Sequence, residues 1–223
     1  MKKLCLFVAC IATQFSFSQT TKTVRAFSKV NIFDQIEVVL VPTTAEEKIE
    51  LTGENKGDVT IINKNGNLKI KMNLANSFQG EDIKAVLYYK TLQGITAEEG
   101  SVIRSTEPIE AISLNINAKT GSDVKLNITA DNVVIKAGAG SIVNLKGSAK
   151  TQDIVSNSGA TVNNKELVTE QTNVTVNAGG VAKVNASKIV DAKTRAGGKI
   201  TIYGNPAQIN EKTIAGGTIT QAK

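Results

Sequence analysis

Aliphatic residues recur along the second half of the chain at two fixed distances from a series of evenly spaced glycines. The glycines lie 18 to 21 residues apart and are Gly100, Gly121, Gly140, Gly159, Gly179, Gly197 and Gly216. Three residues after them stand Ile103, Val124, Val143, Val162, Ala182, Ile200 and Ile219. Five residues before them stand Ile95, Ile116, Ile135, Ile154, Val174, Ala192 and, as the polar exception, Glu211. This regular period predicts a stacked repeat whose interior is lined by the two columns.

Each repeat predicts strands that meet at a tight corner. In "VKLNI", Val124, Leu126 and Ile128 share one face of an extended chain. Glycine accepts the positive φ of a bend, and the residue after each glycine is always Ser, Ala or Gly. Strands that return about every 19 residues stack in parallel. We therefore predict an all-β fold, a single-stranded right-handed parallel β-helix with about seven coils over residues 91–223.

Residues 24–90 do not follow this period. They contain several short alternating runs, and Asn65-Gly66 between two such runs predicts a hairpin. We expect this region of N-terminal strands to start the β-helix and to cap its first coil, because an uncovered sheet edge invites aggregation. A separate small sandwich remains the alternative, although no Pro/Gly/Ser-rich linker divides the chain.

The first residues have the layout of a secretory signal peptide. Lys2 and Lys3 precede an apolar run and small residues, which predicts a signal over residues 1–18 and a single domain over residues 19–223. The apolar run is too short for a transmembrane helix. We expect the mature chain to be exported to the periplasm, the cell envelope or the extracellular space, with no transmembrane segment.

Both cysteines, Cys5 and Cys10, fall inside this signal. The mature chain is therefore expected to have no disulfide and no thiolate metal site. Lipidation of Cys10 is an alternative, because Ala9 precedes it as in a lipoprotein signal. Removing Lys2 and Lys3 lowers the formal charge from +6 to +4, from 24 basic and 20 acidic residues.

Composition narrows the chemistry further. The chain has no histidine and no tryptophan, and its three tyrosines are Tyr88, Tyr89 and Tyr203. It therefore lacks the commonest general base and metal ligand, and it is poor in aromatic platforms for sugars. No Arg/Lys stripe is interleaved with aromatics, which argues against nucleic acid. "GAGSIV" at 138–143 has Val143 where a dinucleotide-binding loop needs its third glycine, and a strand follows where that loop needs a helix.

Scattered carboxylates are the remaining catalytic candidates. Two acids about 5 to 9 Å apart could hydrolyse a glycosidic bond. The available acids on the coils are Asp123, Asp131, Asp153, Glu166, Glu170 and Asp191. Scattered acids on an all-β surface usually only face solvent, so we predict no catalytic residues, no metal site and no cofactor, and we expect the protein not to be an enzyme.

Several segments resemble a known family. They are "FSKVNIFDQIEVVLVP", "GENKGDVTIINKNGNLKIKM", the recurring glycine corners and "GGKITIYGNPAQI". Over about residues 24–223 the chain resembles the auto-transporter adhesin, head GIN domain family of exported Bacteroidetes proteins. Members often carry a glycine pair where this chain has Phe33-Asp34-Gln35. The resemblance implies a β-helical exported domain and brings no catalytic or ligand residues with it.

The functional prediction is a non-enzymatic adhesion or envelope-interaction module that acts through its surface. Its expected partners are a cell-surface glycan, an envelope polysaccharide or a protein. Two alternatives stay open: a carbohydrate-active β-helix of the polysaccharide lyase or glycosidase kind, and a structural envelope protein that assembles into homo-oligomers through the uncovered strand edge of its last coil.

Overall fold

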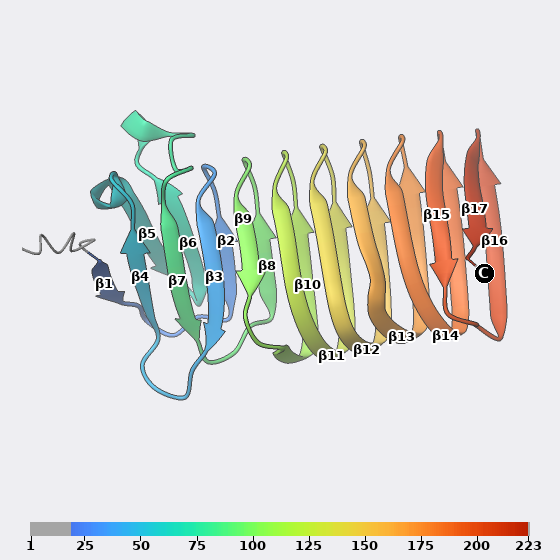
Figure 1. Ribbon diagram of the computed structural model, residues 1–223, viewed down its shortest axis with the longest axis horizontal. Coiled ribbons are helices and arrows are strands. Elements are labelled where there is room, and N and C mark those ends of the chain that lie inside the picture. The colour runs from blue at the N-terminus through green and yellow to red at the C-terminus, as the bar shows by residue number, and fades with distance from the viewer. Residues whose placement is uncertain (1–18, 223) are drawn as a thin grey trace, which may run out of the picture.

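The computed structural model describes residues 19–222, so the predicted signal and both cysteines lie outside the described residues. The described chain is an elongated stack of strands with two short 3-10 helices near its N-terminal end (Figure 1). Within it, no helix is long and apolar enough to span a bilayer.

The strands shorten towards both ends of the stack. The N-terminal elements are β1 (Thr20–Thr23), β2 (Lys29–Ile32), β3 (Glu37–Pro42), β4 (Lys48–Thr52), η1 (Lys56–Asp58), β5 (Val59–Lys64), β6 (Asn67–Met72), η2 (Leu74–Asn76) and β7 (Lys84–Tyr89). The remaining strands are β8 (Gly94–Ala97), β9 (Val102–Ser105), β10 (Ile109–Ala118), β11 (Asp123–Ala137), β12 (Ile142–Ser156), β13 (Thr161–Asn177), β14 (Val181–Arg195), β15 (Gly198–Tyr203), β16 (Gln208–Ile214) and β17 (Gly217–Gln221).

Each coil runs up to a sharp corner and back from it, so the stack has two sheet faces (Figure 1). β8 and β9 are separate strands on the two sides of one corner, whereas β11 to β14 each continue past a gentler bend towards the next corner. Neighbouring coils pair in parallel, with Ile116 beside Ile135 and Ile135 beside Ile154. The predicted parallel β-helix is confirmed.

The two aliphatic columns form the interior. Ile135 and Val143 have no exposed surface, and the other members from Ile95 to Ile200 are at most 2 % exposed. Burying side chains of this size stabilises each by about 1.5–3 kcal/mol, and a coil can do so only against its neighbours. Glu211 continues the column five residues before the glycines, beside Ala192, but lies in the exposed final coil.

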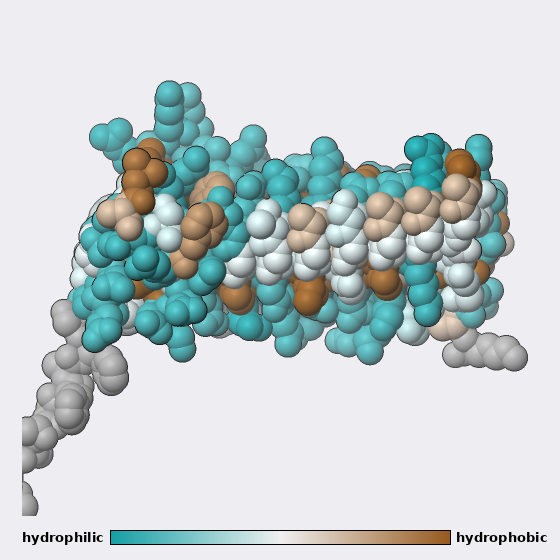
Figure 2. All heavy atoms as spheres, turned by 90° about the horizontal axis from the view of Figure 1, so that it is seen from above, coloured by the Kyte–Doolittle hydropathy of each residue, from teal (hydrophilic) through white to brown (hydrophobic). Residues whose placement is uncertain are grey.

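The glycine corners are two-residue turns in which both central residues are left-handed. At one corner Thr120 has φ 50° and Gly121 has φ 70°, and Ser122 N–H donates to the Lys119 carbonyl at 3.2 Å. This is the geometry of a type I′ turn, which accounts for glycine at the second position. Each corner also binds the next, since Gly121 N–H donates to the Ala139 carbonyl at 3.0 Å. Seen from above, the corners form a smooth ridge of small residues along the stack (Figure 2).

The first corner has the same conformation without glycine. Asp34 and Gln35 occupy it with φ 59° and 65°. The Asp34 side chain, only 4 % exposed, accepts hydrogen bonds from Met72 N–H at 2.9 Å and Phe78 N–H at 3.1 Å. The left-handed conformation usually favours glycine. Here the buried Asp34 carboxylate, which accepts two backbone hydrogen bonds, stabilises the turn instead.

The order of the N-terminal coils in space differs from their order along the chain. β6 and β7 form the outermost coil, and β2 and β3 lie between it and the β8–β9 coil. β1 and β4 extend the β7 side antiparallel, and β5 pairs antiparallel with β6 across Asn65-Gly66. The predicted hairpin is confirmed, and residues before 91 contribute both coils and antiparallel edge strands.

Two positions inside the corner change size in opposite directions along the stack. The residue after the corner glycine runs through Ser122, Ser141, Ala160, Gly180, Gly198 and Gly217. The residue that it faces in the preceding coil runs through Ala97, Ala118, Ala137, Ser156, Val176 and Thr194. Ser122 Oγ still reaches the Ala97 carbonyl at 2.9 Å, whereas a Cβ on Gly198 would lie 2.6 Å from the Val176 oxygen. Close packing therefore limits the combined volume of the two facing side chains.

Candidate functional site

Two of the six candidate acids belong to a ladder of alternating charge on the bend opposite the glycine corners. Asp131 lies 2.8 Å from Lys150 Nζ, and Glu170 lies 2.7 Å from Lys188 Nζ. The hydrogen bond from Lys188 lowers the pKa of Glu170, helped by the charges of Lys188 and Lys150. A glycosidase acid needs a raised pKa, so this shift is in the wrong direction for proton donation.

Asp153 and Asp191 lie on the sheet face that runs up to the corners. Each accepts a hydrogen bond from the asparagine of the following coil: Asn173 Nδ2 reaches Asp153 at 2.7 Å, and Asn210 Nδ2 reaches Asp191 at 2.7 Å. Both asparagines are exposed, as is Asp191. These acids thus act as cross-coil acceptors on an open face.

Asp123 and Glu166 do line one hollow together. They stand two coils apart and four residues apart along the ladder, since Glu166 pairs with Lys146 and Lys146 pairs with Asn127. Strand spacing and rise then place their Cα atoms about 16 Å apart. Only side chains extended straight towards each other would approach the carboxylate separation of about 5–9.5 Å that glycoside hydrolysis uses.

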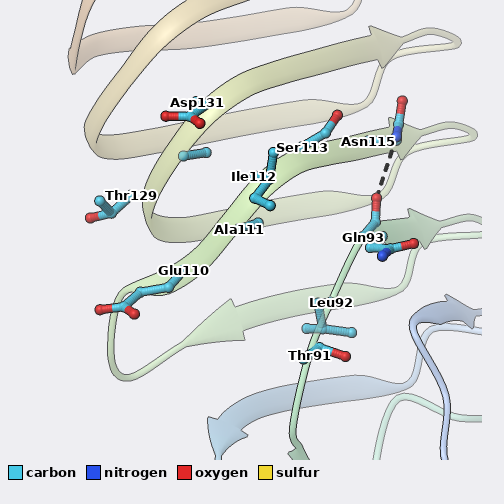
Figure 3. A pocket seen from close by; sticks show the side chains of 11 residues that line it. Thr91, Leu92, Gln93, Glu110, Ala111, Ile112, Ser113, Asn115, Thr129 and Asp131 are labelled. Atoms are coloured by element: carbon cyan, nitrogen blue, oxygen red, sulfur yellow. Dashed lines mark hydrogen bonds between the residues drawn. The ribbon is translucent and has the colours of Figure 1, made fainter.

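A hollow of about 1020 Å³ lies where the loop before β8 meets β10 and β11. Its centre is Ile112, which is 82 % exposed. Asn115 Nδ2 closes one end on the Gln93 carbonyl at 3.4 Å (Figure 3). Glu110 and Asp131 point to the outer side, away from Ile112 (Figure 3). The hollow is thus a shallow, partly apolar surface without converging acids.

A second hollow, of about 580 Å³, lies on the face that leaves the corners, across β9, β11, β12 and β13. We call it the basic groove. Four cations line it, Arg104, Lys125, Lys146 and Lys165. Three half-buried amides lie among them, Asn127, Asn144 and Asn163. Its volume lies in the usual range for ligand pockets, about 300–1,000 Å³.

A β-bulge in β13 shapes one side of the basic groove. β13 has 17 residues, whereas β12 and β14 have 15 each. The register shifts between Asn144 and Lys146 on one side and between Asn163 and Val168 on the other. The extra residues bring Lys165 to the rim, and both Lys165 and Glu166 are exposed. Bulges re-aim side chains in this way next to functional sites.

Buried polar groups hold the bulge from inside. Asn164, fully buried, accepts a hydrogen bond from Leu145 N–H at 3.3 Å and donates to Gln152 at 3.0 Å. Gln152 in turn donates to Thr172 at 2.9 Å and to Thr169 at 3.4 Å. The bulge breaks the backbone ladder at Leu145, and Asn164 supplies the acceptor that this N–H would otherwise lack.

The six acids could be predicted from the sequence, but this groove could not. Its signal was small: the step from Gly159 to Gly179 is 20 residues, and the step from Gly121 to Gly140 is 19. Among residues 19–222, no three carboxylates come together as metal ligands would. The cations and amides of the basic groove are groups that can bind a ligand through charge and hydrogen bonds.

Comparisons with known proteins agree with this architecture. The family model “Putative auto-transporter adhesin, head GIN domain” matches residues 26–206. The crystal structure of a “putative adhesin” from Bacteroides fragilis superposes with TM-score 0.85 at 17 % identity, covering 92 % of this chain and 96 % of that one. One from Parabacteroides merdae gives 0.77 at 16 %, covering 92 % and 96 %. A “putative lipid binding protein” from Parabacteroides distasonis gives 0.68 at 14 %, covering 93 % and 98 %. No curated protein matches the sequence.

Proposed function

The chain belongs to the auto-transporter adhesin, head GIN domain family, and we propose that it is an exported, non-catalytic binding module of the cell envelope. The rigid stack displays polar side chains in ladders that repeat from coil to coil. The observation that carries the proposal is the use of the acids: Asp131 and Glu170 bind lysines, while Asp153 and Asp191 bind asparagines. Two solved structures of this fold are each described as a “putative adhesin”.

The test is a binding survey with the mature chain, residues 19–223. Labelled protein is applied to a glycan array, to extracted envelope polysaccharide and to intact cells. Saturable binding at micromolar protein is the expected result. If the protein binds none of these, the proposed function is wrong; hydrolysis or eliminative cleavage of a bound glycan would instead support the carbohydrate-active alternative.

A second candidate function is lipid contact through the loop that contains η2. Leu74 is 87 % exposed and Phe78 is 58 % exposed. Phe78 has φ 61°, an outlier for a bulky residue, and its N–H is bound to Asp34. Asn76 Nδ2 donates to Asp58 at 2.8 Å. Hydrogen bonds thus hold two apolar side chains out in solvent. One structural neighbour is described as a “putative lipid binding protein”.

Co-sedimentation with phosphatidylethanolamine and phosphatidylglycerol vesicles tests this candidate. The double variant Leu74→Ser/Phe78→Ser should lose vesicle binding if the loop inserts. Ile112→Ser is the matched control, because Ile112 is 82 % exposed and lies elsewhere on the stack. Equal binding by the wild type and the double variant would refute lipid contact by this loop.

A further inference from the structure

The basic groove has two lysines that the protein leaves without a partner. Arg104 Nε lies 3.3 Å from Glu37, and Lys165 Nζ lies 3.9 Å from Glu166. For Lys125 and Lys146, no carboxylate of the described chain lies within 4.0 Å. Both are exposed at the groove. Two positive charges are therefore available to an incoming anion.

The spacing of these lysines limits the anion. Lys146 pairs with Asn127, so it lies one coil over and two residues along from Lys125. Diagonal neighbours of this kind have Cα atoms about 7–8 Å apart. A ligand that carries acidic groups at neighbouring positions can therefore engage both lysines at once.

Two hydrogen-bond acceptors without a donor line the groove beside the lysines. Asp123 Oδ1 and Asn163 Oδ1 are shielded from solvent and have no donor in the described chain. Asn163 Nδ2 already donates to Asn144 at 3.3 Å. A ligand with many hydroxyl groups supplies donors to these acceptors while its acidic groups meet the lysines.

The residues that line the groove argue against single-stranded nucleic acid as the ligand. They include no aromatic side chain, so nucleic-acid bases would have no surface on which to stack. The bulge and its internal hydrogen bonds fix one wall in advance, which favours a rigid ligand that fills a preformed surface.

From these features we infer that the basic groove binds an acidic oligosaccharide, with Lys125 and Lys146 contacting its carboxylate or sulfate groups and the amides of Asn127, Asn144 and Asn163 contacting its hydroxyls. The oligosaccharide lies across the coils between β11 and the β13 bulge. This inference rests on the proposed function and assigns it a site and a ligand class.

Calorimetric titration with a galacturonic acid hexamer tests the inference, and a heparin hexasaccharide tells sulfate from carboxylate. The wild type should bind at least one of them at micromolar concentration. The variant Lys125→Gln/Lys146→Gln should bind about tenfold or more weakly, since each lysine supplies a charged hydrogen bond. Both lysines are exposed, so the urea midpoint of this variant should stay that of the wild type.

The matched control is Lys136→Gln/Lys193→Gln, which removes the same charge from the opposite sheet face. The inference is supported if this control binds as the wild type does and the fully methyl-esterified hexamer does not bind. It is overturned if the two double variants weaken binding equally, or if poly-glutamate binds as well as the sugars. Binding of neutral glycans alone in the survey would overturn this site and leave the proposed function standing.

Discussion

Replacing Gly180 with alanine should destabilise the stack, although an alanine is normally harmless at such a backbone conformation. The φ of Gly180 lies outside the left-handed region, so the change adds no backbone strain. A Cβ built there would lie 2.8 Å from Ser156 Oγ and 3.1 Å from the Ser156 carbonyl oxygen. Overpacking of this kind costs about 1–3 kcal/mol. Loss of the glycine's freedom in the unfolded chain offsets about 0.4–1 kcal/mol.

The structure also predicts the rescue. One coil earlier, the equivalent positions are Ala137 and Ala160, so Ser156→Ala/Gly180→Ala recreates a pair that the chain already tolerates. Ser156→Ala alone loses the hydrogen bond from Ser156 Oγ to the Ala160 carbonyl, at 2.9 Å, worth about 0.5–1.5 kcal/mol. Because the double variant removes the shorter of the two contacts, the one with Ser156 Oγ, its loss should fall short of the sum of the single losses by about 1 kcal/mol or more.

The free energies of unfolding of the wild type, the two single variants and the double variant are measured by urea unfolding followed by circular dichroism. Gly179→Ala is the matched control: a Cβ there meets nothing within 4 Å, but φ is 71°. Its cost, about 1–2 kcal/mol of left-handed strain, should be unaffected by Ser156→Ala. If Gly180→Ala is neutral, or if its cost simply adds to that of Ser156→Ala, the reasoning from packing across the corner is wrong.

Three further changes test other parts of the stack. Burial, and next the charge of Asp34, raise the pKa of the Glu99 carboxyl in the folded protein. The folded state is therefore stabilised while Glu99 is protonated, and this stability is lost as pH rises through the raised pKa. Glu99→Gln should abolish this loss and raise the urea midpoint at pH 7. Asn164→Ala leaves Leu145 N–H without an acceptor and should cost about 1–3 kcal/mol in urea unfolding. Glu211→Ile extends the aliphatic column to an exposed edge and should cause self-association in sedimentation velocity; a variant that stays monomeric at every concentration would show that Glu211 does not guard this edge.

The sequence was most informative where the same physical demand recurs in every coil. The corner glycines and the aliphatic columns could be predicted because each coil repeats the same turn and the same interior. The first corner could not be predicted. Asp34 and Gln35 adopt the left-handed conformation there because Asp34 accepts hydrogen bonds from the backbone N–H groups of Met72 and Phe78, which lie far along the chain. The order of the first coils was likewise invisible, because it depends on pairing between strands that are distant in sequence.

The basic groove lies where β13 departs from the regular period of the coils. Counting acids gave six candidates but no geometry, and the structure put four of them to use as partners of Lys or Asn. The basic groove depends on where the additional residues of β13 go. That is decided by Asn164 and Gln152, which bond to one another inside the stack, and no spacing rule reveals this.

The spatial order of the first coils, which differs from their order along the chain, protects the β2–β3 coil from opening at the end of the stack. The β2–β3 coil, made early in the chain, is clamped between the β6–β7 coil and the β8–β9 coil. It cannot peel away as an end coil would, because two interfaces must break together. This end is complete only once β9, which ends at Ser105, has paired with β3. We expect the β16–β17 coil, which pairs with one neighbouring coil in the described chain, to open first. Amide exchange should accordingly be fastest there and slow in β2 and β3.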